Sequence, residues 1–273
     1  MTDLAASPLG RASTYGDRYD PTLLYPVERA PLRATLGIEG APPFHGEDVW
    51  TAYELSWLDE RGKPEVAIAT FRFPATSPCI VESKSVKLYL TALNQTRFAS
   101  PASVSATLVR DLENATRGRV TVELALPASF DALPVAEPRG ISLDDLPLAS
   151  DDYLPCPDAL SATGTEVAET VSTRLFRSLC PVTGQPDYGN VVIAYRGRAI
   201  DRAGLLRYLV SYRRQPGFHE HCVEAIFTDV WRRCAPEFLA VHARFTRRGG
   251  IDINPYRSSA PLTPPVNART ARQ

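Results

Sequence analysis

A short internal repeat is the feature that most constrains how this chain folds. The first copy begins at Ser56 and leads through a glycine, a proline and an acid into the apolar run Val-Ala-Ile-Ala. The second copy begins at Ser178, 122 residues later, and has the serine, glycine, proline and acid at the same spacing before Val-Val-Ile-Ala. This pattern indicates a duplicated unit, provided that the segments around both copies also correspond.

The first half of the chain shows one strand, two helices and a further strand. Residues 66–71 are rich in β-branched and apolar residues, which is typical of a strand. Apolar residues at helical spacing predict helices within 84–93 and 104–112. Residues 119–126 then alternate between apolar and polar, which predicts a second strand.

The second half repeats this order of elements. Residues 191–195 predict a strand, and the spacing of apolar residues predicts helices within 205–212 and 222–234. Residues 239–245 alternate as a strand does. Together with the repeat, this order predicts an α+β protein with two related modules, each an antiparallel sheet covered by helices.

The domain boundaries follow from composition. Residues 127–165 are rich in proline, aspartate and serine, as segments between modules are. We therefore expect a first module over 41–145 and a second over 166–273. Residues 1–40, whose first thirty are polar and rich in turn formers, are expected to form an N-terminal arm.

Charge and cysteine content exclude several classes of protein. The chain has 30 Lys and Arg against 31 Asp and Glu, whereas a protein that grips a phosphate backbone normally carries a basic excess. The five cysteines are scattered, with no C-x-x-C pair that would indicate a zinc ribbon. There is no signal peptide and no apolar run long enough to span a membrane. We therefore expect a cytoplasmic protein with free thiols that binds neither nucleic acid nor membrane.

The duplication isolates Cys180, because the first copy has Leu58 at the equivalent place. Cys180 opens the segment Cys-Pro-Val-Thr-Gly-Gln-Pro-Asp, whose prolines and glycine form a rigid loop that fixes it relative to Asp187. A thiol is a strong nucleophile once deprotonated, and a carboxylate nearby can take up and return the proton. The alternative is a buried cysteine that only fills the core.

Two further segments open predicted helices. Glu82-Ser83-Lys84-Ser85 combines an acid with hydroxyls and a lysine, which suits an anion at a helix N-terminus but also suits a simple N-cap. His219 and Glu220 precede His221 and Cys222. A zinc site is a weak interpretation there, since H-E-x-x-H is absent, and Glu220 could simply complement the helix dipole.

The segment from Arg248 to Pro255 follows the last predicted strand. It comes directly after Arg247 and holds the adjacent Gly249 and Gly250, which let a backbone approach a ligand closely but also fit an ordinary turn. Neither G-x-G-x-x-G nor a Walker A motif occurs in the chain, so a nucleotide would be held by another device.

Taken together, these segments resemble the family of NADPH-dependent 7-cyano-7-deazaguanine reductases, the nitrile reductases of queuosine biosynthesis. The resemblance extends over about residues 40 to 260. It rests on Glu82-Ser83-Lys84-Ser85 with Lys87-Leu88-Tyr89, the Ser178–Asp187 segment, Phe218-His219-Glu220-x-Cys222, and Arg248-Gly249-Gly250-x-Asp252-Ile-Asn254-Pro255. It implies the long form of the family, built from tandem tunnelling-fold (T-fold) modules, and a homodimer.

The resemblance also implies a role for each residue in these motifs. Cys180 would add to the nitrile carbon to give a covalent thioimide, Asp187 would move the proton, and His219 would line the site and assist. Two successive NADPH molecules would supply hydrides. The remaining residues divide between the base, held by Val81, Glu82, Ser83, His219 and Glu220, and NADPH, met by Ser83, Lys84, Arg248 and Gly249. No metal is implied.

Two other functions stay open on the sequence. One is a pterin- or purine-processing enzyme of the GTP cyclohydrolase type, which needs a Cys/His metal set that His221 and Cys222 supply poorly. The other is a base-binding module without turnover, against which the presence of both Cys180 and Asp187 argues. Since Glu82 and Cys180 belong to different halves, the site is expected where the modules meet, within one chain or across a dimer.

Overall fold

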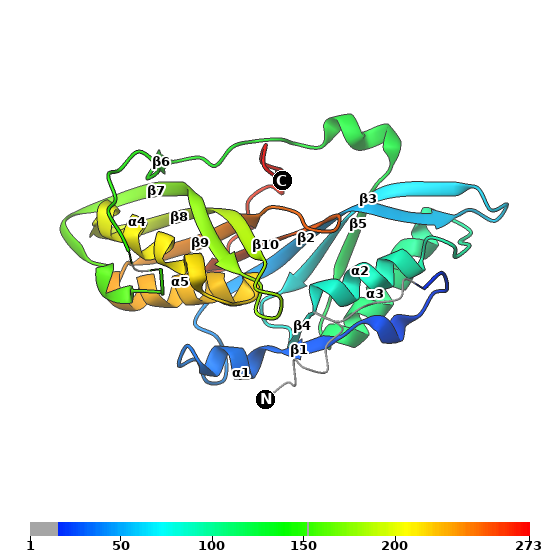
Figure 1. Cartoon of the computed structure of the whole chain (residues 1–273), viewed down its shortest axis with the longest axis horizontal. Helices are drawn as coiled ribbons and strands as arrows, with labels where there is room; N and C mark the ends of the chain where they lie inside the picture. The colour runs from blue at the N-terminus through cyan, green and yellow to red at the C-terminus, as the bar shows by residue number, and fades with distance from the viewer. Residues whose placement is uncertain (1–15, 152) are drawn as a thin grey trace.

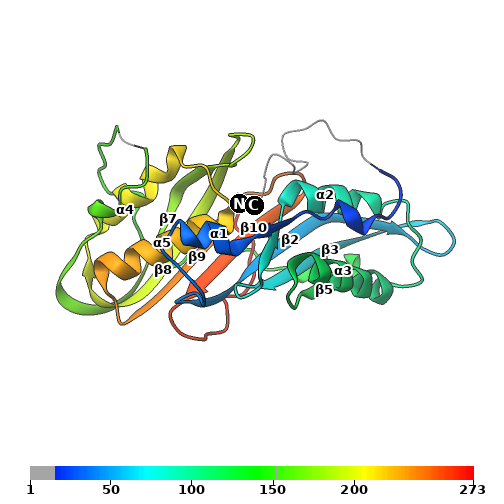
Figure 2. The same cartoon turned by 90° about the horizontal axis from the view of Figure 1, so that it is seen from below.

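The structure is a computed structural model that describes residues 16–151 and 153–273, and most of their strands form one long sheet (Figure 1). The strand order is β5-β3-β2-β10-β9-β8-β7-β6. Helices α2, α3, α4 and α5 cover one face of this sheet in both views (Figures 1 and 2). The predicted α+β class, with an antiparallel sheet covered by helices, is confirmed.

The first half forms one end of the sheet. Its elements are β2 (His45–Leu58), β3 (Pro64–Pro74), the short β4 (Cys79–Val81), α2 (Ser83–Ala92), α3 (Pro101–Thr116) and β5 (Thr121–Ala125). Apolar side chains of α2 and α3 meet those of β2 and β3 in one buried cluster, in which Phe71, Tyr89 and Leu108 are fully buried. The predicted strand, two helices and strand are present in this order.

The second half forms the other end of the sheet. Its elements are β7 (Ala162–Leu179), β8 (Pro186–Ile200), α4 (Arg202–Ser211), α5 (His219–Cys234), β9 (Phe238–Phe245) and β10 (Ile251–Ser258). A second buried apolar cluster lies between α4, α5 and these strands. The predicted elements again occur in order, and α5 begins directly at His219.

The two halves share a single sheet, which differs from the two separate sheets that we predicted. Strand β10 pairs antiparallel with β2 along its whole length, from Ile251 opposite Ala52 to Ser258 opposite His45. The physical reason is that each half alone would expose a long edge strand with unpaired N–H and C=O groups. Pairing β2 with β10 satisfies both edges at once.

The N-terminal segment is more ordered than an extended arm. It contains the single-turn helix η2 (Pro21–Leu23), strand β1 (Pro26–Glu28), which pairs with β4, and helix α1 (Arg29–Ala34). Figure 2 shows β1 and α1 crossing the helical side of the molecule between α2 and α5. The described residues of the expected N-terminal arm therefore contain regular elements, and residues 1–15 lie outside the described part.

The segment between the halves has little regular structure. It contains the short elements η3 (Pro127–Ala132), β6 (Ile141–Ser142) and η4 (Pro157–Ala159). Figure 1 shows its first part running along the face of the sheet opposite to the helices. Among the described residues, no helix is both long enough and apolar enough to cross a membrane.

Candidate active site

Residues from both halves of the chain line one pocket beside the β2–β10 seam. Residues that the sequence singled out make up most of its wall: Val81, Ser83, Cys180, Asp187, His219, Glu220 and Arg248. Trp50 of β2 and Ile253 of β10 complete the side nearest to the sheet. The cavity is small, at about 20 Å³, which is room for roughly one water molecule.

Cys180 sits in the loop between β7 and β8 and is buried. Burial opposes ionisation of the thiol, but hydrogen bonds from the Thr183 side chain and from the backbone N–H groups of Thr183 and Val182 favour the thiolate, as does one from Arg248. Together they lower the pKa of Cys180 below its ordinary value. The loop between β7 and β8, together with Arg248, therefore favours the ionised form of Cys180.

Asp187 lies at the start of β8, with its side chain only 5% exposed. Its Oδ1 is 3.1 Å from Nε of Arg248, and its Oδ2 is 3.5 Å from Nε2 of His219. The His219 ring packs on the ring of Phe245, with 3.9 Å between ring centroids. Arg248 therefore interacts with both Cys180 and Asp187, although the sequence assigned it to the cofactor alone.

Glu220 occupies the first turn of α5 and is buried. Burial raises the pKa of Glu220 to about 7, and the nearby carboxylate of Asp48 acts in the same direction, whereas His219 and Arg29 act in the opposite one. Its Oε1 is buried without a hydrogen-bond partner in the described structure. A carboxylate held in this way is prepared to accept hydrogen bonds from a ligand.

Two other polar atoms of the pocket lining are buried without a hydrogen-bond partner among the described residues. They are Nε1 of Trp50, which is a donor, and Nε2 of His219. Buried polar groups are nearly always paired, so three such atoms around one pocket indicate that a polar ligand completes them. The sequence analysis missed Trp50, because a tryptophan within a strand is indistinguishable from a core residue.

Glu82 is next to the pocket but does not line it. Its carboxylate caps α2, where Oε1 accepts from the backbone N–H of Lys84 at 2.6 Å and Oε2 from that of Ser85 at 2.8 Å. Glu82 is fully buried, and this burial raises its pKa despite the two hydrogen bonds. Glu82 is therefore an N-cap, which the sequence analysis gave as the alternative to an anion site at this helix N-terminus.

Lys84 and Gly249 also lie outside the pocket wall. Gly249 adopts a positive φ of 57° in the turn before β10, and a side chain added there would begin 3.0 Å from Cδ of Lys87. Lys87 is largely buried, and burial together with the charge of Arg248 lowers its pKa. Two cations, Lys87 and Arg248, are thus held close together at this side of the site.

The other cysteines lie outside this pocket, although Nη2 of Arg117 donates a hydrogen bond to Sγ of Cys79 at 2.9 Å. They are unpaired, and burial raises the pKa of Cys222 to about 12 and that of Cys234 to about 11. In the described part of the chain, no group of three or more His, Cys, Asp or Glu side chains could hold a metal ion.

Comparisons with known proteins match this chain over almost its whole length. Residues 15–124 match the family model described as nitrile reductase, 7-cyano-7-deazaguanine-reductase N-terminal part, and residues 186–262 match the model described as QueF-like protein. A protein of Bordetella avium, named NADPH-dependent 7-cyano-7-deazaguanine reductase, is 52% identical over 99% of both chains.

Two further relatives with the same name agree. The protein of Chromobacterium violaceum is 54% identical over 98% of this chain and 96% of its own, and that of Burkholderia ambifaria is 55% identical over 98% of each. Among solved structures, the archaeosine synthase QueF-Like in its apo form matches 37% of this chain and 99% of its own at 18% identity, with a TM-score of 0.32.

Proposed function

Since this chain belongs to the NADPH-dependent 7-cyano-7-deazaguanine reductase family, we propose that it reduces the nitrile of that base through a covalent bond to Cys180. The chain is an NADPH-dependent oxidoreductase that converts the nitrile to an aminomethyl group for queuosine synthesis. The observation that carries the covalent mechanism is the low-pKa thiol of Cys180 beside the buried carboxylate of Asp187 in one pocket.

The polar atoms left without partners match the hydrogen-bonding edge of the base. Its ring N–H and exocyclic amine are donors, and the ionised carboxylate of Glu220 accepts both as a bidentate pair. The indole N–H of Trp50 is available to an acceptor of the base, such as its carbonyl oxygen. Val81, Ser83 and His219 line the same wall, and Glu82 retains free lone pairs besides those used to cap α2.

The first chemical step joins enzyme and substrate. The Cys180 thiolate attacks the nitrile carbon, one bond of the C≡N group breaks, and Asp187 delivers the thiol's proton to nitrogen, which gives a thioimide. Bound NADPH supplies a hydride to carbon, and this happens twice per substrate. Between the two reductions the C–S bond breaks, so that Cys180 leaves as a thiolate and an imine remains. One further proton reaches nitrogen to give the amine, and a second proton restores the thiol of Cys180.

The residues next to the pocket fit a dinucleotide phosphate. Lys87 and Arg248 are adjacent cations that an anion would stabilise, and the Gly249 turn has no side chain to block a close approach. We propose that Ser83, Lys84, Arg248 and Gly249 hold NADPH, with Lys87 as an addition that the sequence did not suggest. Because the Arg248 side chain is 22% exposed and contacts Asp187, it must move when the bicyclic base enters the small cavity.

Several features of the whole enzyme belong to the same proposal. We assign 41–145 and 166–273 to two T-fold modules, since two long strands, two helices and a further strand follow in this order in each half, with β4 and β10 as additional strands. We further propose a cytoplasmic homodimer that acts on the free base and not on nucleic acid. The small net charge of −1 supports the last point.

The test is the mass of the intact protein after mixing with 7-cyano-7-deazaguanine in the absence of NADPH. We expect an increase equal to the full mass of the substrate, because addition of the thiol to a nitrile loses no atom. Cys180→Ala should show no increase, whereas Cys222→Ala, which removes a buried thiol of high pKa, should still form the adduct. If Cys180→Ala reduces the nitrile at the wild-type rate, the covalent mechanism is wrong.

A further inference from the structure

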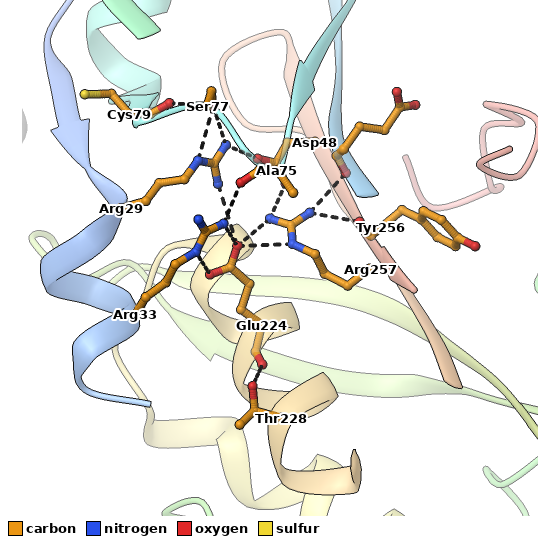
Figure 3. Close-up of polar contacts among 11 residues, drawn as sticks. Arg29, Arg33, Asp48, Ala75, Ser77, Cys79, Glu224, Thr228, Tyr256 and Arg257 are labelled. Carbon is orange, nitrogen blue, oxygen red and sulfur yellow. Dashed lines mark hydrogen bonds and ion pairs between the residues drawn. The ribbon is translucent and has the colours of Figure 1, made fainter. Parts of the chain in front are cut away.

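A buried cluster of charged residues joins α1, β2, α5 and β10 (Figure 3). We call it the arginine cluster, and its members are Arg29, Arg33, Asp48, Glu224 and Arg257. They come from α1, β2, α5 and β10, and each is at most 6% exposed. None of them was singled out by the sequence analysis.

The contacts within the cluster are short. Nη2 of Arg29 is 2.5 Å from Oδ2 of Asp48, while Nη2 of Arg257 is 2.8 Å from Oδ1 of Asp48. Nη2 groups of Arg33 and Arg257 lie 2.7 and 2.8 Å from the same Oε1 of Glu224. Removal of Arg29 therefore leaves Asp48 paired with Arg257.

The arginine cluster has an excess of one positive charge, because it holds three guanidinium groups and two carboxylates. An excess charge in a dry interior is costly unless another charge compensates it. Glu220 is one helical turn before Glu224 on the same helix, so the two side chains are neighbours. With Glu220 ionised, the six buried groups are electrically neutral.

We propose that Arg29 is a positioning residue that keeps Glu220 ionised, so that Glu220 accepts both donors of the base. The inference rests on the proposed role of Glu220 in substrate binding. Arg29 acts through Glu220 and does not touch the substrate. This role of Arg29, the first residue of α1, gives a functional reason why the segment of β1 and α1 crosses between the two halves.

The charged groups around Glu220 come from every element that surrounds the site. Behind it are Asp48 of β2 and Arg29 of α1, and beside it is His219. Across the pocket lie Cys180, Asp187 and Arg248. Burial raises the pKa of Glu220 to about 7 and Asp48 acts in the same direction, whereas His219 and, to a smaller extent, Arg29 favour ionisation of Glu220.

Opposite changes in the pKa of Glu220 follow from opposite substitutions. Loss of the Arg29 charge raises this pKa, so a larger fraction of Glu220 is protonated at neutral pH and cannot accept two hydrogen bonds. Loss of the Asp48 charge lowers the pKa, so binding persists to lower pH. At a pH well below the pKa of Glu220, the affinity for the base falls about tenfold when this pKa rises by one unit.

The experiment measures the Kd of 7-cyano-7-deazaguanine by calorimetry between about pH 5.5 and about pH 9, with the full chain and no NADPH. The Cys180→Ala background prevents adduct formation. In Arg29→Met we expect the pH midpoint of binding to move up, with affinity about fivefold lower at neutral pH for a pKa rise of one unit and regained at high pH. Arg29→Lys should stay near the parent, and Asp48→Asn should move the midpoint down.

Arg33→Met is the matched control, because it removes an equally buried guanidinium of the same helix that pairs with Glu224 and not with Asp48. A purely structural role predicts weaker binding at all pH values in both arginine variants, with no change of midpoint. That result, or equal midpoint changes in Arg29→Met and Arg33→Met, overturns the inference. If Arg29→Met does not fold, Asp48→Asn provides the test. A downward movement of its binding midpoint supports the inference, and an unchanged midpoint contradicts it. The adduct on wild-type Cys180 tests the proposed function separately.

Discussion

At the scale of single residues, Arg248 connects the two groups proposed to do the chemistry. Its guanidinium donates a hydrogen bond to Sγ of Cys180 and lies 3.1 Å from Asp187, so it favours negative charge at both positions. Arg248 also belongs to the proposed NADPH site, so one side chain lies between the proposed nucleophile, the proposed proton donor and the proposed cofactor.

Trp50 provides a residue-scale prediction. Trp50→Phe keeps an aromatic ring against Phe73 but removes the only donor that the indole brings to the pocket. An acceptor of the base is then buried without a partner, which costs about 1–3 kcal/mol and weakens substrate binding by roughly tenfold or more. The Kd of the base, measured by calorimetry with Cys180→Ala as the parent, checks this.

Trp57→Phe is the control for that measurement. Trp57 lies on the same strand, is equally buried in the same apolar cluster and does not line the pocket. It should lose stability without losing affinity. Equal affinities for Trp50→Phe and the parent would remove Trp50 from the site.

At the scale of elements, the first helix over the sheet in each half has the same kind of N-cap. Glu82 caps α2 by accepting from the backbone N–H groups of Lys84 and Ser85. Asp201 caps α4 by accepting from those of Ala203 and Gly204. Only the first of these caps adjoins the pocket, so the second provides an internal comparison.

We predict that Glu82→Ala and Asp201→Ala each lower the free energy of unfolding by about 1 kcal/mol, because each helix loses its side-chain cap. If Glu82 also holds the base, only Glu82→Ala raises the KM for the nitrile. Urea unfolding and steady-state kinetics on both variants separate the two effects. An unchanged KM in Glu82→Ala limits that residue to its capping role.

The helices and strands that could be predicted from the sequence are those that carry a local pattern of apolar residues. The helices have apolar residues at helical spacing, and β3, β5, β8 and β9 contain apolar runs or alternation. Strand β10 was missed because Gly249, Gly250 and Pro255 indicate a turn. Nevertheless every residue of β10 is buried, since β2 and β9 enclose it. Long-range pairing of this kind leaves no local signal.

The residues of the candidate site likewise divide into those that a local motif indicates and those that only the fold brings together. Cys180, Asp187 and Glu220 belong to motifs with unusual chemistry, and the structure places all three in one pocket. Trp50, Arg29 and the rest of the arginine cluster act through contacts between segments far apart in the chain. A lone tryptophan or arginine is ordinary in any sequence, so only the fold reveals their relation to Glu220.

At the scale of the whole molecule, the buried carboxylates make stability depend on pH in two opposite ways. Ion pairs in the arginine cluster lower the pKa of Glu224 to about 2, although burial acts against this. Its stabilisation is therefore present above the ordinary pKa of about 4.5 and is lost as the pH falls towards 2. Glu220 behaves in the reverse sense, because burial raises its pKa to about 7.

Between about pH 4.5 and about pH 7, Glu220 is ionised in the unfolded chain but protonated in the folded one. The folded state therefore binds more protons, and stability decreases as the pH rises through this window. We predict that Glu220→Gln, which has nearly the same shape and no charge, unfolds at higher urea concentration than the wild type at pH ~8. The gain in free energy should be on the order of 3 kcal/mol, and it should vanish near pH ~4.5.

Glu224→Gln provides the contrast in the same urea titrations, since it should be less stable than the wild type at neutral pH and approach it only in acid. A Glu220→Gln variant no more stable than the wild type at pH ~8 would contradict the raised pKa. If the gain is found and the variant also binds the base weakly, then the carboxylate that recognises the base is kept at the expense of the fold. The substrate then restores this stability when it donates its two hydrogen bonds to Glu220.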